Sequence, residues 1–280
     1  MRGLDYFELD RQTFLRSNLE EKLDDVRILT NRYISHPNEL ISSILPYVSK
    51  THNLNEIVLL GQALRLSHNY HSTGEFSVRD SGDTYLVHPI QTGVILKELG
   101  MDLATRAAAI LHDVIENNQD MKEQIIEEMY SQNLGASLPY VIAMTPPSNI
   151  TNSKLKKEAI QKQVTEFRTE FGKFDTQKKI YGLRSADRLT NLLTLGYMQP
   201  KDGRSPEERI MGVVYDTRKN ILQLAQEFDI AFGAELKLHD YMFDTLGRYK
   251  PSTEYLSMLK HAASLGLGYL HSETPVLNTI

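Results

Sequence analysis

The stretch ILHDVIEN places four polar side chains beside an otherwise apolar run. His112 and Asp113 follow Ala107–Leu111 directly, and Glu116 and Asn117 come three and four residues after Asp113. Burying an imidazole and a carboxylate is costly unless they are paired with each other or bind a metal ion. Residues three and four apart share a helix face, so this spacing predicts one face that presents all four side chains. Such a face could hold a metal ion.

Other histidines carry weaker signals. The dipeptide His239-Asp240 lies in a mixed sequence without companion ligands, and we interpret it as ordinary helix surface. A buried packing pair is the alternative reading of His112-Asp113, but the apolar neighbours favour a functional site. His68 and His71 precede a turn-forming Ser-Thr-Gly sequence, so we interpret them as exposed turn residues. The alternative is that they share a helix face near the site.

The composition excludes several kinds of functional site and classes of protein. The chain has 280 residues, nine histidines and no cysteine, so thiolate ligands, disulfides and thiol nucleophiles are excluded. Its 31 basic and 36 acidic residues give a net charge of −5, which argues against a nucleic-acid partner. The charged N-terminus does not resemble a signal peptide. No run reaches the roughly 18–20 apolar residues of a membrane span, so we expect a cytoplasmic protein with no membrane partner. The oligomeric state stays open.

The elements that must position these residues have helical periodicity. Pro89 suits the first turn of a helix, where its missing N–H costs nothing, and no alternating β pattern of useful length is present. We expect an all-α fold with a compact core at residues 55–235, an N-terminal helical extension at 1–54 and a C-terminal helical extension at 236–280. The segments predicted to be helical are 57–66, 90–99, 103–115, 177–195 and 207–228.

Four residues occur along the chain in the same order as the motif residues of a known family, which the sequence resembles. His88, His112-Asp113 and Asp187 match the H…HD…D order of the HD-domain metal-dependent phosphohydrolases. The motifs RDSGDTYLVHP, ILHDVIEN and ADRLTNLLTL are similar to those of the hydrolase domain of RelA/SpoT alarmone enzymes and of small stand-alone alarmone hydrolases. The resemblance covers about residues 55–232 and implies an HD-domain helical bundle.

The resemblance also implies roles for individual residues. The implied metal ligands are His88, His112, Asp113 and Asp187, a mixed imidazole and carboxylate set that suits Mn²⁺ or another divalent cation. Glu116 and Asn117 stand where the family carries an acidic pair that orients or activates the attacking water. The residues implied to bind substrate are Arg79, Ser81, Arg184, Asn191 and Tyr215.

The implied reaction is hydrolysis of the 3′-pyrophosphate of guanosine tetra- or pentaphosphate (ppGpp or pppGpp), giving GDP or GTP and pyrophosphate. Asn117 departs from the family pattern, because an amide can form hydrogen bonds but cannot act as a base. Two alternatives therefore stay open. One is a phosphatase for another nucleotide, such as NADPH or a nucleoside phosphate. The other is a nucleotide sensor with weak or no turnover.

Overall fold

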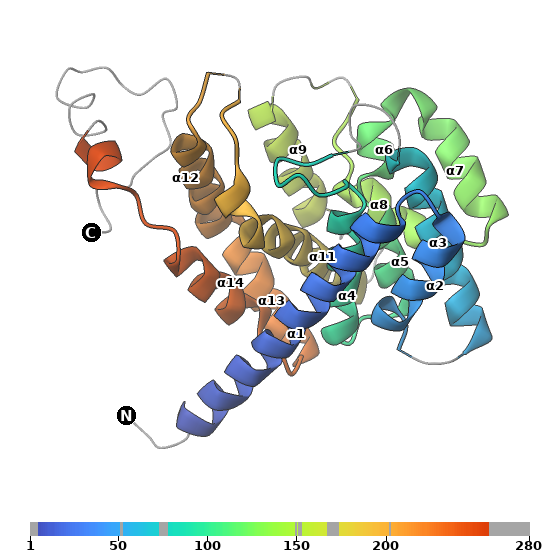
Figure 1. The fold of residues 1–280 in the computed structure, drawn as a ribbon, viewed down its shortest axis with the longest axis horizontal. Helices are drawn as coiled ribbons and strands as arrows, with labels where there is room; N and C mark the ends of the chain where they lie inside the picture. Colours follow the sequence, from blue (N-terminus) through green and yellow to red (C-terminus); the bar gives the residue numbers. More distant parts are fainter. Residues whose placement is uncertain are drawn as a thin grey trace.

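The periodic segments form helices in a computed structural model, which describes residues 5–50, 53–72, 78–148, 150, 153–166, 174–201 and 203–257. Over those residues the chain forms no β-sheet, and the prediction of an all-α fold is confirmed. None of the described helices combines the length and apolarity needed to cross a membrane. The helices (Figure 1) are α1 Asp5–Tyr33, α2 Pro37–Val48, α3 Leu54–His71, α4 Val87–Glu98, α5 Leu103–Leu111, α6 Val114–Asn117, α7 Lys122–Ser131, α8 Leu138–Met144, α9 Ser153–Glu166, α11 Phe174–Leu193, α12 Pro206–Asp216, α13 Leu222–Phe232 and α14 Leu238–Gly247.

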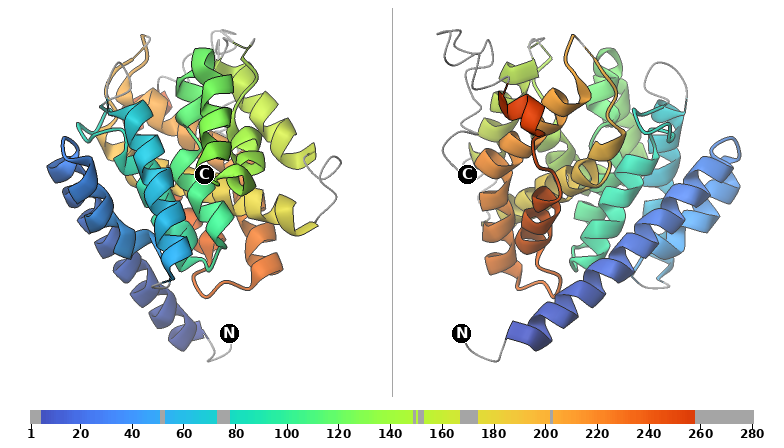
Figure 2. Two further views of the ribbon diagram at one scale, coloured as in Figure 1. Left: turned by 90° about the vertical axis from the view of Figure 1, so that its right-hand side faces the viewer. Right: turned by 60° about the vertical axis from the view of Figure 1, so that its left-hand side comes forward.

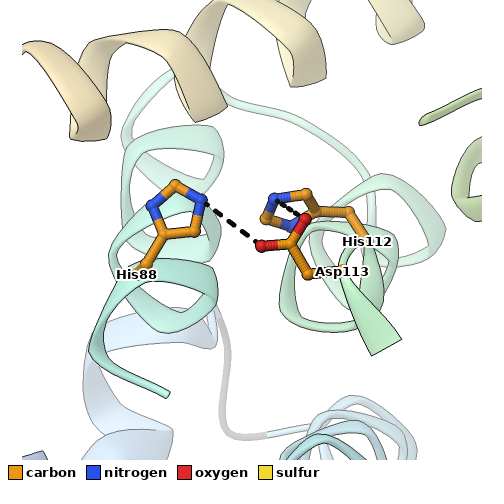
Figure 3. Close-up of side chains that lie close together, drawn as sticks. All are labelled: His88, His112 and Asp113. Carbon is orange, nitrogen blue, oxygen red and sulfur yellow. Dashed lines mark ion pairs between the residues drawn. The ribbon is translucent and has the colours of Figure 1, made fainter. Parts of the chain in front are cut away.

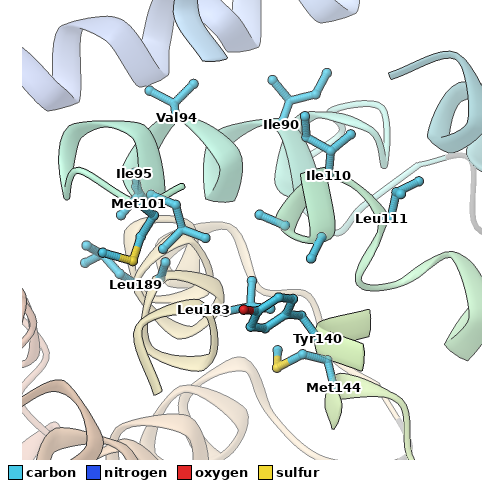
Figure 4. Packing of buried hydrophobic residues seen from close by; sticks show 14 of the residues in the cluster. Ile90, Val94, Ile95, Met101, Ile110, Leu111, Tyr140, Met144, Leu183 and Leu189 are labelled. Atoms are coloured by element: carbon cyan, nitrogen blue, oxygen red, sulfur yellow. The ribbon is translucent and has the colours of Figure 1, made fainter. Parts of the chain in front are cut away.

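Helix α4 lies at the centre of the bundle and packs against α1, α5 and α11. Every residue from Val87 to Leu96 is buried, so this helix has no solvent-facing side over most of its length. Gly93 leaves room for Ile110 of α5, because a Cβ added there would lie 3.1 Å from the isoleucine side chain. Apolar side chains of α4, α5, α8 and α11 fill the space between these helices (Figure 4).

A second close approach joins α11 to α13. A Cβ added at Gly182 would lie 2.5 Å from the ring of Phe228, which is fully buried. Only glycine lets the two helices meet at this distance, since interiors pack densely and a ring has nowhere to move. The contact sets the distance between α13 and the helix that carries Asp187.

Helix α1 crosses the outside of the bundle and links the two ends of the described chain (Figure 2). Its C-terminal half packs on α2 and α4, where Tyr47 donates a hydrogen bond to Asp25 and Gln91 donates one to the Leu23 carbonyl. Towards its N-terminal end, Arg16 forms an ion pair with Asp244 of α14, and Tyr241 of α14 donates a hydrogen bond of 2.7 Å to Glu20. The rest of the C-terminal extension, from residue 258 onwards, lies outside the described residues.

Two of the predicted helices are interrupted. Residues 103–115 do not form one helix, because α5 ends at Leu111 and α6 begins at Val114. The His112 ring contacts the carbonyl oxygen of Ala109 at 2.7 Å, and this is the oxygen that an unbroken helix would offer to the Asp113 N–H. The segment 207–228 contains a π-helical turn, Thr217–Ile221, between α12 and α13.

Candidate functional site

Four side chains from three parts of the fold meet at one point. His88 lies in the first turn of α4, His112 and Asp113 lie between α5 and α6, and Asp187 lies on α11. The Nε2 atom of His88 is 3.1 Å from Asp187 Oδ1 and 3.7 Å from Asp113 Oδ2. The Nε2 atom of His112 is 3.2 Å from Asp113 Oδ1 and 3.7 Å from Asp187 Oδ1. Figure 3 shows three of these side chains turned towards one another.

Main-chain and side-chain hydrogen bonds fix the orientation of both imidazoles. Thr190 donates a hydrogen bond of 2.7 Å from its hydroxyl group to the Asp187 carbonyl oxygen, so the hydroxyl oxygen accepts one of 2.8 Å from the N–H at Nδ1 of His88. The carbonyl of Ala109 can only accept, so Nδ1 of His112 is also the protonated nitrogen. When neutral, each ring therefore presents the lone pair of its Nε2 atom to the same point.

Charges around the cluster favour a cation there. Burial disfavours the charged form of His112, but the carboxylates of Asp113 and Asp187 outweigh it and raise its pKa to about 9. For His88, burial and the charge of Arg79 dominate instead and lower the pKa to about 4. The pKa of Asp187 lies well below its usual range, because the two nearby histidines and the charge of Arg184 outweigh its burial. Two carboxylates thus share one positive charge, which a proton or a metal ion could supply.

The donor set suits a divalent metal ion. His88, His112 and Asp113 offer ligand atoms that all lie within 4.8 Å of one another, and the described residues contain no other such group. The Nε2 atom of His112 is buried and makes no hydrogen bond within the described part of the chain, although carboxylate oxygens lie close by. A buried ring nitrogen that faces two carboxylates is the arrangement that a metal ion would complete.

His88, Asp113 and Asp187 of the cluster line a pocket of about 600 Å³, a size that fits a nucleotide. Cationic side chains outnumber acidic ones in its lining, against the net negative charge of the whole chain. Such a local field attracts anionic ligands. The cationic lining residues are Arg79, Lys156, Arg184, Arg188, Lys201 and Arg209, and the acidic ones are Asp80, Asp113, Glu116 and Asp187.

Most of the residues expected to bind substrate line this pocket. Arg79 donates a hydrogen bond of 2.8 Å to Asn191, and Asn191 in turn donates one of 2.9 Å to the Asp187 carboxylate. Arg184 pairs with the other oxygen of Asp187 at 2.9 Å. Ser81 lines the rim. One connected network therefore runs from the cluster of His88, His112, Asp113 and Asp187 to the cations of the pocket wall.

Tyr215 is not brought to this pocket. Arg209 and Val213 of α12 are four residues apart and line it, whereas Tyr215 lies two residues further on, about 200° around the helix. Its ring instead meets the ammonium group of Lys219 at 5.7 Å.

Glu116 and Asn117 both line the pocket beside Asp113. Burial, together with the charge of Asp113, raises the pKa of Glu116 to about 7, even though Lys156 and Arg184 oppose the shift. A carboxyl group with this pKa can exchange a proton near neutral pH. Asn117 lies 3.3 Å from Nε2 of His71 through its amide nitrogen.

The interpretation of His68 and His71 as exposed turn residues is wrong. Helix α3 continues to His71, which is 1% exposed, and His68 is 9% exposed. The 3- and 4-residue spacing of Leu64, Ser67 and His71 indicates a shared helix face and could have revealed this burial. His239-Asp240, by contrast, lies on the surface of α14 as expected, with Asp240 60% exposed.

Two residues at the site were not singled out by the sequence reasoning. Tyr85 donates a hydrogen bond of 2.8 Å to Asp113, and Arg79 lies over its ring at 5.5 Å. Thr190 fixes the His88 ring. Both lie within the motifs RDSGDTYLVHP and ADRLTNLLTL, but nothing in their spacing indicates a hydrogen bond to a residue on another helix.

Comparisons with known proteins also indicate an HD domain. A family model described as HD domain matches residues 63–218. The bifunctional (p)ppGpp synthase/hydrolase SpoT of Escherichia coli (strain K12) is 30% identical over 171 residues, 60% of this chain and 21% of that protein. A guanosine-3′,5′-bis(diphosphate) 3′-pyrophosphohydrolase of Vibrio cholerae serotype O1 is 26% identical over 201 residues, 71% of this chain and 26% of that protein. A GTP pyrophosphokinase of Myxococcus xanthus is 26% identical over 213 residues, covering 76% and 26%. The chain thus spans about a quarter or less of these relatives, whose names include both hydrolysis and synthesis.

Proposed function

Because this chain belongs to the HD domain family, we propose that it is a metal-dependent hydrolase that removes the 3′-pyrophosphate of ppGpp or pppGpp. One observation carries the proposal: two Nε2 atoms and two carboxylates converge beside a pocket whose wall is rich in cations. A phosphate ester suits both the metal-ligand cluster and the cationic wall, since its oxygens can bind a metal ion and the cationic side chains at the same time. The names of the relatives supply the guanosine substrate class.

His88, His112, Asp113 and Asp187 would hold the ion, for which Mn²⁺ is our proposal. When bound, a divalent ion lowers the pKa of water and neutralises charge on phosphoryl oxygens. Glu116 would take the proton of the attacking water, as its pKa of about 7 allows. Water adds to phosphorus, the bond to the 3′ oxygen breaks, and that oxygen takes up a proton. Arg79 and Arg184 would bind the anionic pyrophosphate as it leaves.

Because position 117 carries an amide and not an acid, we expect hydrolysis of the substrate to be slow. The Asn117 amide can orient a water molecule but cannot remove its proton, so Glu116 would be the only base of the pair. The same residue is the observation that favours the second candidate, a nucleotide sensor with little turnover.

Purified protein loaded with Mn²⁺ should release pyrophosphate from ppGpp and pppGpp in a panel that also contains NADPH and nucleoside phosphates. Asp113→Ala should lose both the metal and the activity. Asp240→Ala removes the acid of the other HD dipeptide and should retain both, which makes it the matched control. Phosphate release from another panel member alone would replace the proposed substrate. Silence across the panel at stoichiometric metal would favour the sensor.

A further inference from the structure

The loop of residues 78–84 carries Arg79 to the pocket, and its shape depends on Asp83. Val78 and Thr84 form an antiparallel bridge, and Gly82 takes the left-handed conformation at the turn, with φ of 84°. The Arg79 N–H donates to the Asp83 carbonyl at 2.9 Å. The carboxylate of Asp83 accepts a hydrogen bond of 2.8 Å from Ser81. We call residues 78–84 the Arg79 loop.

One side chain of α1 holds this loop from outside the pocket. Asn31 donates from its amide nitrogen to Asp83 Oδ1 at 2.7 Å, and its amide oxygen accepts from the Thr84 N–H at 2.9 Å. The nitrogen and the oxygen of a single side-chain amide thus form hydrogen bonds with two adjacent residues of the Arg79 loop. Arg27, one turn earlier on α1, adds a charge 3.7 Å from the same carboxylate oxygen.

The other contacts of the Arg79 loop are less able to fix it. Asp80 pairs with Arg209 of α12 at 2.8 Å, but the Asp80 side chain is 40% exposed, and exposed ion pairs contribute little. Asp83, in contrast, is only 13% exposed. On the pocket side, Arg79 reaches Asn191, a contact that a phosphate ligand could replace.

We propose that Asn31 is a positioning residue for substrate: through Asp83 and Thr84 it holds Arg79 where the phosphate groups bind. The inference rests on the proposed function, because it assigns Arg79 to phosphate binding. It makes α1 part of the substrate-binding machinery, although no α1 residue lines the pocket. Loosening the Arg79 loop should weaken phosphate binding while the metal ligands, which lie on other elements, remain in place.

The test measures the affinity of Mn²⁺-loaded protein for inorganic pyrophosphate by calorimetry. Asn31→Ala should weaken binding about fivefold, the effect of one net hydrogen bond. Asn31→Asp keeps an acceptor for Thr84 but places a carboxylate against Asp83, so its loss should be larger. Adding Asp83→Asn to Asn31→Asp restores a donor–acceptor pair and should return the affinity to within about twofold of wild type. Asn18→Ala, an exposed asparagine on the same helix, is the matched control and should leave affinity unchanged.

Metal content and thermal unfolding are measured for every variant. With ppGpp as substrate, Asn31→Ala should raise KM with kcat changed less than about twofold, as expected for lost binding rather than lost chemistry. Wild-type affinity in both single variants, or no recovery in the folded double variant, overturns the inference. The absence of pyrophosphate binding by the wild-type protein also overturns it. Pyrophosphate binding needs no turnover, so an Asn31 effect can stand even if ppGpp is not hydrolysed and the proposed function fails.

Discussion

Replacing Thr190 with valine should weaken metal binding while the size of the side chain is preserved. The Thr190 oxygen is the acceptor for Nδ1–H of His88, at 2.8 Å. Valine leaves that buried N–H without a partner, which costs about 1–3 kcal/mol. The ring can then move its proton to Nε2, the atom that faces Asp187. Losing such a support for a ligating histidine costs about 10–100-fold in metal affinity, or roughly 1.4–2.7 kcal/mol.

The assay is a Mn²⁺ titration by calorimetry or by competition with a chelator. Thr190→Ser keeps the hydroxyl group and should bind the metal as the wild-type protein does. Thr245→Val is the matched control, because Thr245 is a buried helical threonine whose hydroxyl donates to a carbonyl four residues earlier on α14. Equal metal affinity in Thr190→Val and Thr245→Val would refute the role given to the Thr190 hydroxyl.

Three further changes test the site and the packing. Asn117→Asp should raise kcat by at least about tenfold under saturating Mn²⁺, because a carboxylate can accept a proton and an amide cannot; an unchanged kcat in steady-state assays would show that the asparagine does not limit turnover. Gly182→Ala should lower the free energy of unfolding by about 1–3 kcal/mol through overpacking against the Phe228 ring, whereas Gly212→Ala, with open space at its Cβ, should raise it by up to about 1 kcal/mol in the same denaturant titration. Asp102, the N-cap of α5, has its pKa lowered because hydrogen bonds to Lys179 and Thr105 outweigh its burial. Asp102→Asn keeps a capping side chain, so its stability deficit in denaturant titrations should be fully present above the ordinary pKa of an aspartate, about 3.9, and should disappear as pH falls through the lower pKa of the folded state.

The sequence predicts the local parts of the site better than their assembly. The apolar run before His112 and the spacing to Glu116 indicate a helical segment with one polar face, and both features depend only on neighbouring residues. His88 and Asp187 come from helices separated by about a hundred residues, and no periodicity can say that their side chains approach to 3.1 Å. The resemblance to a family supplied that pairing, because a family's motif order carries information about tertiary contacts.

The features that sequence reasoning missed depend on side-chain to main-chain bonds or on tertiary burial. The break after Leu111 follows from the His112 ring taking a helix carbonyl, an event that helix propensity does not describe. His71 is buried because α3 extends beyond the predicted segment 57–66 and turns its last residue, His71, towards the interior. Tyr215 stays a prediction for substrate binding, but it does not line the pocket, since a match to a family motif does not fix which side of its helix a side chain occupies.

The link between α1 and α14 has a consequence for how the protein is made. Of the described helices, α1 is synthesised first and α14 is among the last. More than two hundred residues must therefore be added after Glu20 before its partner Tyr241 is present. Closing so long a loop costs entropy, although the cost grows only with the logarithm of its length. The C-terminal half of α1 can dock earlier on α2 and α4. On a nascent chain, the contacts of α1 with α14 would therefore form only after α14 has been made.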